Sequence, residues 1–360
     1  MLKSNEKLSS LDGLRAISIF LVLFNHLKIQ NNAFEGHGNF QWITDLLTDG
    51  QLGVNVFFVI SGFLITTLLL TEEDKTGTIS LKYFFIRRTL RIFPAYYFLL
   101  LVYFILQLFH QIEISTNSWI TSISYTKYFN WDTDWYTAHF WSLSIEEHFY
   151  LIWPVIFVSA KKQRKRIAFV LLFVAPVVRV TSYFYPVFWL NDFSLFARID
   201  ALAIGCLFAL YKDQILARIS QHWRWYFFGA ISILILVRYL PWLTHEIGHG
   251  TYYLSFATGS SHGTIANLCI AVIMMYSVFG PRKLWFNFLN ARIMIFIGLL
   301  SYSIYLWQQF FISSSNKWYT STPYNLILLF IAALTSYYLI EKPFLRLKAK
   351  FKQESKTAMY

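Results

Sequence analysis

Two ionisable residues, Arg15 and His26, lie within the first apolar segment of the chain, Leu14–Ile29. Over the eleven residues that separate them, an α-helix returns to within ~20° of its starting direction and rises ~16 Å. A permanent cation and a titratable imidazole therefore face the same way at two depths. An ionisable residue at membrane depth costs at least ~2.5–3.5 kcal/mol and usually marks a site or a pathway. The alternative is a snorkelling arginine and a histidine that bonds a neighbouring helix.

Two adjacent carboxylates, Glu146 and Glu147, lie within the apolar segment that begins at Phe140. Neighbouring residues on a helix point ~100° apart, so we expect one of the two, not both, to meet any single partner. By helical rise, Glu146 lies ~22 Å from Lys161 at the other end of its segment. We place it in the outer half of the bilayer with His26, where a carboxylate could orient the imidazole and raise its basicity.

Three arginines, Arg87, Arg88 and Arg91, precede another apolar segment. Arg88 and Arg91 are three residues apart and share a helix face. Paired guanidinium groups bind phosphate through parallel hydrogen bonds, which suits a nucleotide-bearing donor that arrives from the cytosol. The alternative is a topological charge that fixes the orientation of the helix.

Smaller signals lie on two further apolar segments. Ser61 and Gly62 would let a helix or a ligand approach the backbone closely, and for these two residues alone helix packing is the favoured interpretation. Arg198 and Asp200 enter a later segment, and Arg179 lies within the segment before it. Asp200 could bind substrate or form a structural ion pair with an arginine, and the sequence leaves both open.

The composition predicts an all-α, polytopic membrane protein. Of the 360 residues, 56% are hydrophobic and 14% are charged, and the mean hydropathy is +0.45. The apolar blocks are ~18–20 residues long, as spanning helices require, whereas a β-barrel would show short alternating strands. Cys206 and Cys269 both lie in apolar blocks and have neither disulfide nor zinc spacing, so we expect no metal.

Basic residues fix the expected topology. With both termini in the cytoplasm, 24 lysines and arginines lie inside and three, Lys28, Lys127 and Lys317, lie outside. Basic cytosolic loops that face anionic lipid explain the net charge of +12, so no nucleic-acid partner is needed. We expect ten membrane-spanning helices, at residues 13–30, 52–71, 90–109, 140–159, 167–186, 195–211, 225–243, 263–279, 293–312 and 324–341.

The stretch Ser118–Trp135 could be mistaken for an eleventh span. It is polar at several positions, and counting it would place a basic loop outside, so we interpret it as an extracytoplasmic loop that could be partly re-entrant. The chain is thus expected to form one transmembrane domain, residues 1–345, and a short basic cytoplasmic tail, residues 346–360.

Taken together, these motifs resemble acyltransferase family 3, the integral-membrane O-acyltransferases that modify bacterial surface and secreted glycans. The resemblance covers nearly the whole chain, with its markers in the order typical of the family. They are Leu11–Ala16 with His26, Phe57–Leu64, Arg88 and Arg91 before Ile92–Tyr97, Phe140–Tyr150, Arg198–Gly205, Ser301–Trp307 and Glu341–Phe344.

The resemblance implies an acyl-coenzyme A co-substrate, with acetyl the expected group, and a cell-surface glycan as the acceptor. The pantetheine arm of coenzyme A is roughly as long as the ~16 Å rise from Arg15 to His26. Many members place a histidine after the Tyr-Leu-Trp motif, whereas this chain has Gln308, so we assign that position no proton-transfer role. Some members carry an extracytoplasmic esterase-like domain, and here we expect such a transferase to be a separate periplasmic protein or unnecessary.

The resemblance and the geometry together assign site residues. Phosphates bound by Arg15, Arg88 and Arg91 would place the thioester near His26, which acts as the general base or as a brief acyl carrier, oriented by Glu146 or Glu147. Ser61 and Gly62 complete the expected cofactor-binding set. The residues expected to bind the acceptor are Trp141, Ser142, Arg198, Asp200, Tyr302 and Trp307.

Two other functions could use the same polar residues. One is a transporter or flippase of glycans or acyl groups, which would need a polar path through the bilayer. The other is a donor-side relay that passes the acyl group to a separate partner. We place the protein in the bacterial cytoplasmic (inner) membrane. The sequence leaves the glycan open, whether lipopolysaccharide O-antigen, capsule, peptidoglycan or secreted polysaccharide, and it leaves a homo-oligomer open as well.

Overall fold

The computed structural model describes residues 9–31, 41–129, 134–185, 191, 193–247, 263–315 and 317–357. Every regular element in these ranges is helical, which confirms the all-α prediction. Short 3₁₀ helices lie at Lys127–Phe129 (η1), Ser220–His222 (η2) and Trp318–Thr320 (η3), and a π-helical segment lies at Ser336–Glu341 (η4). The α-helices are α1 (Ser9–Asn31), α2 (Gln41–Leu47), α3 (Gly50–Thr76), α4 (Leu81–Leu108), α5 (Thr116–Ile123), α6 (Trp135–Ala138), α7 (Phe140–Ser159), α8 (Arg164–Phe184), α9 (Leu195–Leu210), α10 (Lys212–Ile219), α11 (Trp223–Ile247), α13 (Thr264–Phe279), α14 (Leu284–Leu289), α15 (Arg292–Phe311), α16 (Tyr324–Thr335) and α17 (Lys342–Thr357).

Long apolar helices make this a membrane protein. Within the described ranges, five helical stretches are long and apolar enough to cross a bilayer: α1, α3, α4, α15 and the continuous stretch Tyr324–Phe351. The remaining expected spans also coincide with helices, namely α7, α8, α9, α11 and the shorter apolar helix α13. The helical segments are thus where the sequence predicts them, and the count of ten spans stays a prediction.

The stretch Ser118–Trp135 is not a span in the part of it that the structure describes. It contains most of α5, all of η1 and the first residue of α6. These helices have eight, three and four residues, so the longest extends ~12 Å at 1.5 Å per residue. None of them could cross the ~30 Å hydrocarbon core, as the loop interpretation requires.

By their internal contacts the residues form two units. The first comprises residues 1–25, 34–67 and 162–301, and the second comprises residues 26–33, 68–161 and 302–360. The division passes through α1, so Arg15 belongs to the first unit and His26 to the second. In the first unit α8 packs against α9, and α13 packs against both α9 and α11.

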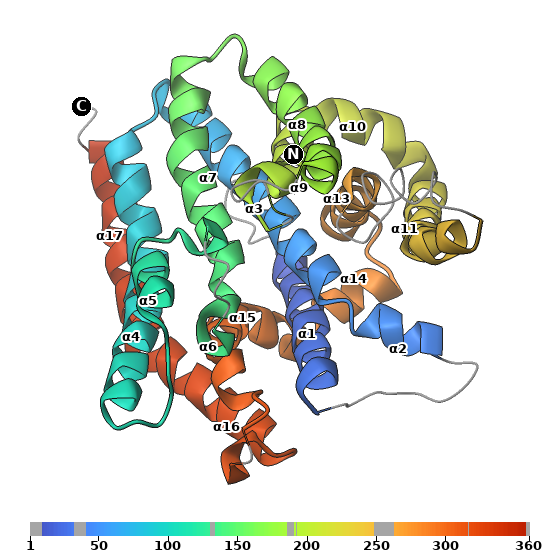
Figure 1. Cartoon of the computed structure of the whole chain (residues 1–360). Coiled ribbons are helices and arrows are strands. Elements are labelled where there is room, and N and C mark those ends of the chain that lie inside the picture. Colours follow the sequence, from blue (N-terminus) through green and yellow to red (C-terminus); the bar gives the residue numbers. More distant parts are fainter. Residues whose placement is uncertain are drawn as a thin grey trace. The chain divides into compact units, whose positions relative to one another are not determined.

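In the second unit α4 packs along α17 (Figure 1) and also contacts α7 and η4. Residues 342–357 form α17, so most of the stretch expected to be a basic tail continues a long helix. Helix α17 follows α16 and η4 without a break in helical structure.

Two glycines let α3 and α9 cross at backbone contact within the first unit. A Cβ at Gly62 would overlap the carbonyl oxygen of Leu202, and a Cβ at Gly205 would overlap that of Val59. Small residues at such crossings allow close van der Waals packing between membrane helices. This close crossing is what the packing interpretation of Gly62 expects, and the predicted role of Gly62 in cofactor binding stays a prediction.

We expect Gly62→Ala and Gly205→Ala to destabilise the protein by about 1–3 kcal/mol each, because the added methyl group must push two backbones apart. The measurement is the melting temperature of the detergent-purified protein. Gly229→Ala is the matched control, since a Cβ there meets nothing within 4 Å. Equal melting temperatures for all three variants would contradict the close crossing.

Candidate functional site

His26 lies on α1 and is half-buried. Its Nδ1 is 3.1 Å from Oε1 of Gln308, which lies on α15 and is fully buried. The indole of Trp135 meets the imidazole edge-on, with 5.5 Å between the ring centroids. The imidazole is therefore held by a hydrogen bond at one nitrogen and by an aromatic ring, and it keeps some exposure.

From the sequence we expected Glu146 or Glu147 to orient His26, whereas the partner of Nδ1 in the structure is an amide oxygen, and the role of the two carboxylates stays a prediction. The residue hydrogen-bonded to His26 is Gln308, the position to which no proton-transfer role was assigned. Glu147 is buried on α7, and its carboxylate interacts electrostatically with Arg88. Glu146, the neighbouring residue, is half-buried. Helical rise had placed His26 and the carboxylates at one depth, but it carries no information about which way each helix is turned.

The C-terminal end of α15 also anchors the groups around His26. Trp135 Nε1 donates to the carbonyl oxygens of Gln309 and Ile312, each at 2.9 Å. His139 is buried, with Nδ1 2.5 Å from Oε1 of Gln309 and Nε2 3.2 Å from the carbonyl oxygen of Leu306. The last two turns of α15, with Ile312 directly after them, thus hold both the indole that contacts His26 and His139, the residue that precedes α7. Neither His139 nor Gln309 was predicted from the sequence to be a site residue. The position of His139 directly before an apolar span could have indicated one, because ionisable residues at membrane depth usually mark a site.

Lys127, counted in the sequence as an outside charge, is 2% exposed. Its ammonium donates to Ser118 Oγ at 2.7 Å and to Thr137 Oγ1 at 2.8 Å. Partial burial disfavours the charged form of Asp134, but hydrogen bonds from Ser118 and Ser115 and the charge of Lys127 together lower the pKa of that carboxyl. Lys127 therefore connects α5 to α6, the helix that carries Trp135. Nothing in the sequence distinguished Lys127 from an ordinary exposed charge in a loop.

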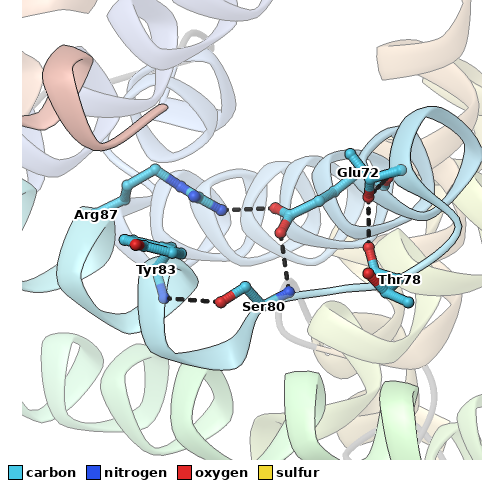
Figure 2. Close-up of polar contacts among 6 residues, drawn as sticks. Glu72, Thr78, Ser80, Tyr83 and Arg87 are labelled. Atoms are coloured by element: carbon cyan, nitrogen blue, oxygen red, sulfur yellow. Dashed lines mark hydrogen bonds and ion pairs between the residues drawn. The ribbon is translucent and has the colours of Figure 1, made fainter. Parts of the chain in front are cut away.

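Arg87 closes the turn between α3 and α4 (Figure 2). Its Nη2 is 2.7 Å from Oε2 of Glu72, and Oε1 of the same carboxylate accepts the backbone N–H of Ser80 at 3.0 Å. Ser80 in turn caps α4 by accepting the backbone N–H of Tyr83. The arginine and its carboxylate thus have a structural task at the start of the helix.

Arg88 and Arg91 have different surroundings in the same unit. The guanidinium of Arg88 lies 3.4 Å from the ring centroid of Tyr150 and is half-buried. Its Nε has no hydrogen-bond partner among the described residues. Arg91 interacts electrostatically with Glu341, a buried carboxylate that accepts a hydrogen bond from Ser303.

Glu341 is the last residue of the π-helical segment η4. Such segments are rare and frequently lie at functional sites. Glu341 belongs to one of the motifs that resemble the family, and the sequence assigned it no predicted role. A carboxylate at the end of an apolar span could have indicated a functional residue at this position.

Four residues expected to bind substrate also lie in the second unit. The hydroxyl of Tyr302 donates to the carbonyl oxygen of Ile92 on α4 at 2.9 Å. Oγ of Ser142 is 2.5 Å from the hydroxyl of Tyr305. Trp307 is buried, and Trp141 is half-buried on α7. The structure therefore brings His26, the two arginines and these four residues into one unit, and their roles in binding stay predictions.

The other expected site residues lie in the first unit. Arg15 pairs with Asp12, three residues earlier on α1, at 2.9 Å. Arg198 donates to Oε1 of Gln51 at 3.0 Å. Ser61 is half-buried on α3. The structure gives each of the two arginines a protein partner and leaves their predicted roles untested.

Asp200 forms the ion pair that the sequence left as one of two alternatives. Arg179 Nη2 lies 3.0 Å from Oδ2 of Asp200, and both side chains are 0% exposed. Thr264 accepts from the guanidinium at 2.8 Å and donates to the carboxylate at 2.6 Å. The pair is thus desolvated and shares a hydroxyl, which is how a buried charge pair is stabilised.

We expect Asp200→Asn to destabilise the protein by about 3–5 kcal/mol, because it leaves the Arg179 cation buried without its counter-charge. Thermal melting of the purified protein measures this. The double variant Arg179→Met with Asp200→Leu removes both charges and should recover most of the loss, and it should also retain acyltransferase activity. A double variant that is stable but inactive would show that the pair acts on substrate.

Comparison with known proteins identifies the family. The sequence model of acyltransferase family 3, described as an acyltransferase domain, matches residues 8–341. The protein named Putative O-acetyltransferase SACOL0978, of Staphylococcus aureus strain COL, is 31% identical over 387 residues, which cover 95% of this chain and 58% of that protein. O-acetyltransferase OatA of S. aureus strain NCTC 8325 is 29% identical over 374 residues, 93% of this chain and 57% of its own length. The chain thus spans less than two thirds of these relatives, and no solved structure matches it. On the family match, which takes in α1 through η4, the chain belongs to acyltransferase family 3.

Proposed function

We propose that this protein is an O-acetyltransferase of the bacterial cytoplasmic membrane. It takes an acetyl group from cytosolic acetyl-coenzyme A and transfers it to a hydroxyl of an extracytoplasmic cell-surface glycan. Membership of acyltransferase family 3 and the similarity to two proteins named as O-acetyltransferases support the reaction class. The distribution of basic residues supports ten spans with both termini in the cytoplasm.

The observation that carries the proposal is the setting of His26. A half-buried imidazole on a membrane-spanning helix has Nδ1 against an amide oxygen and an indole against its edge. A fixed, partly accessible imidazole can accept the proton of a sugar hydroxyl as that hydroxyl attacks a thioester carbonyl carbon. When the tetrahedral intermediate collapses, the C–S bond breaks and the same proton passes to the leaving sulfur.

The donor end of the proposal rests on Arg88 and Arg91. Both lie in the first turns of α4, which the positive-inside rule places at the cytosolic face. We assign Arg88 and Arg91 to phosphate because they share a helix face, whereas Arg87 is bonded to Glu72 at the turn before α4. Arg88 stacks its guanidinium face on Tyr150, and stacking leaves the N–H edge of a guanidinium available for hydrogen bonds. The part of Arg15 in phosphate binding stays a prediction.

His26→Ala should lower glycan acetylation at least about 100-fold, because it removes the proposed general base. Purified parent and variant proteins are incubated with labelled acetyl-coenzyme A and candidate glycans. Expression, membrane insertion and melting temperature serve as controls for folding. Undiminished glycan labelling in a folded variant refutes the role of His26.

The same assay separates the rival functions in the parent protein. Label on the glycan supports the transferase, thiol release without glycan labelling supports a donor-side relay, and neither product supports a transporter. Comparing ester groups on the surface polymers of a strain that lacks this protein with those of its parent then identifies the acceptor.

Lysine substitutions test Arg88 and Arg91 as the proposed phosphate clamp, because lysine keeps the positive charge of arginine. Arg88→Lys and Arg91→Lys should raise KM for acetyl-coenzyme A tenfold or more and leave kcat nearly unchanged, because lysine cannot form two parallel hydrogen bonds to phosphate. Arg87→Lys is the matched control and should leave KM close to that of the parent. A uniform effect of all three substitutions would indicate that these arginines act as topological charge.

A further inference from the structure

Aromatic rings from four segments of the second unit pack together near the site of His26. Between ring centroids, Phe310 on α15 lies 6.2 Å from Tyr103 on α4 and 6.4 Å from Tyr136 on α6. Tyr319, on η3, stacks on Phe310 at 5.7 Å with 11° between the ring planes. These four residues, Tyr103, Tyr136, Phe310 and Tyr319, form one group that we call the aromatic cluster.

Trp318 lies beside the aromatic cluster and gives it an exposed edge. Its ring meets that of Tyr319 edge-on at 5.9 Å, and it lies 6.3 Å from the ring of Tyr324. Trp318 is 68% exposed, whereas Tyr103 is 0% exposed and the other rings of the cluster are half-buried. The cluster is therefore anchored in the protein at Tyr103 and presents open ring surface at Trp318.

Hydrogen bonds hold the segment that carries Trp318 and Tyr319 in place. Nζ of Lys317 donates to the carbonyl oxygen of Gln111, which lies beyond the C-terminal end of α4, at 3.1 Å. Oγ1 of Thr320 donates to the carbonyl oxygen of Lys317 at 2.8 Å. Rings that are already oriented lose less freedom when a ligand binds, so the cluster is suited to binding.

The aromatic cluster begins next to both groups that hold His26. Tyr136 directly follows Trp135, whose indole contacts the imidazole edge-on. Phe310 lies two residues beyond Gln308 on α15, a rise of ~3 Å. The positive-inside rule places this end of α15 outside the cytoplasm, which is the side from which the proposed acceptor arrives.

The alternative occupant of such rings is lipid, because tyrosine and tryptophan also anchor helix ends at the membrane interface. Tyr185, at the end of α8 and 73% exposed, has the position of an anchor of that kind. The rings of the aromatic cluster instead pack on one another beside a proposed base, and they line one side of it. A pyranose suits them, because the C–H groups on one sugar face carry partial positive charge, which the negative face of an aromatic ring attracts.

We propose that Trp318 and the aromatic cluster bind the sugar units that flank the acetylated one, so that the acceptor is a glycan of several units and not a single sugar. This inference rests on the proposed function. The reacting hydroxyl reaches His26, and the neighbouring units lie over the rings of Tyr319 and Trp318. These rings contact sugar units that do not react, so they act on the affinity for the acceptor and not on the chemical step.

The test compares acceptors of different length. The probes are de-esterified fragments of one to four sugar units, cut from the surface polymer that loses ester groups in a strain without this protein. With acetyl-coenzyme A as the donor, KM of the parent protein for the fragment should fall about tenfold or more from one unit to four, because the longer fragment reaches the aromatic rings.

Two substitutions remove ring surface from the proposed subsite. Trp318→Ala and Tyr319→Ala should each raise KM for the four-unit fragment about tenfold and leave kcat nearly unchanged, because the lost contact is equal in the ground state and the transition state. Trp318→Phe keeps a ring and should keep most of the affinity. Tyr185→Ala is the matched control and should keep the KM of the parent, since Tyr185 is exposed on a helix of the first unit.

Thermal melting shows that each variant is folded. Folded Trp318→Ala and Tyr319→Ala variants with the KM of the parent for the four-unit fragment overturn the proposal, and so does a parent KM that is independent of fragment length. An equal rise of KM in Tyr185→Ala would indicate anchoring in lipid and would overturn it as well. Failure of the proposed function is distinguishable, since the parent would then acetylate no fragment of any length, and this inference would fall with it.

Discussion

The hydrogen bond between His26 and Gln308 is the contact on which the proposed site depends. Polar groups within apolar helices must find partners in the protein, because hydrocarbon offers none. The last turns of α15 provide such partners for three groups in succession. Gln308 serves His26, the carbonyl oxygens of Gln309 and Ile312 serve the Trp135 indole, and Gln309 with Leu306 serves His139. A short stretch of one helix therefore positions most of the polar residues near the imidazole.

The arginines near the start of α4 show how one residue type takes different tasks in one segment. Arg87 donates from Nη2 to the carboxylate of Glu72. Arg88 instead uses its flat face on Tyr150, and Nε keeps its hydrogen-bonding capacity. A stacked guanidinium is restrained in direction without losing its donors. This arrangement suits recognition of a phosphate group better than either a freely rotating arginine or one already paired.

Much of the fold could be predicted from the sequence, because apolar block length and charge placement report on helices directly. The block expected at residues 140–159 coincides with α7. The partners of the site residues could not be read in the same way. His26 and Gln308 are 282 positions apart, and their contact depends on how two helices are rotated. Rise along a helix placed His26 at the depth of Glu146 and Glu147, but it could not name Gln308 as the partner of Nδ1, and the carboxylate of Glu147 interacts electrostatically with Arg88.

Burial shows the roles of two charged residues, Lys127 and Asp200, that the sequence alone could not distinguish from other charged residues. Lys127 entered the topology argument as an exposed outside charge, yet it is enclosed and bonded to Ser118 and Thr137. Asp200 forms the ion pair that was one of its two interpretations, with Arg179 as the partner, and its predicted role in substrate binding stays a prediction. A buried charge needs a partner, and the apolar segment around Asp200 indicated this for that residue, whereas Lys127 carried no such signal. The sequence had no means of naming which residue would supply it.

The second unit also contains a physical link between the proposed base and the proposed phosphate clamp. Tyr302, on α15, donates to the carbonyl oxygen of Ile92, the residue that follows Arg91 on α4. Gln308 lies six residues further along α15, a rise of ~9 Å in a continuous helix. The amide that holds His26 and the tyrosine that holds α4 beside Arg91 are thus fixed at a set separation by a rigid element. Acyl transfer from a long, flexible donor depends on such a fixed spacing, because catalysis gains from holding both ends of the donor before the chemical step.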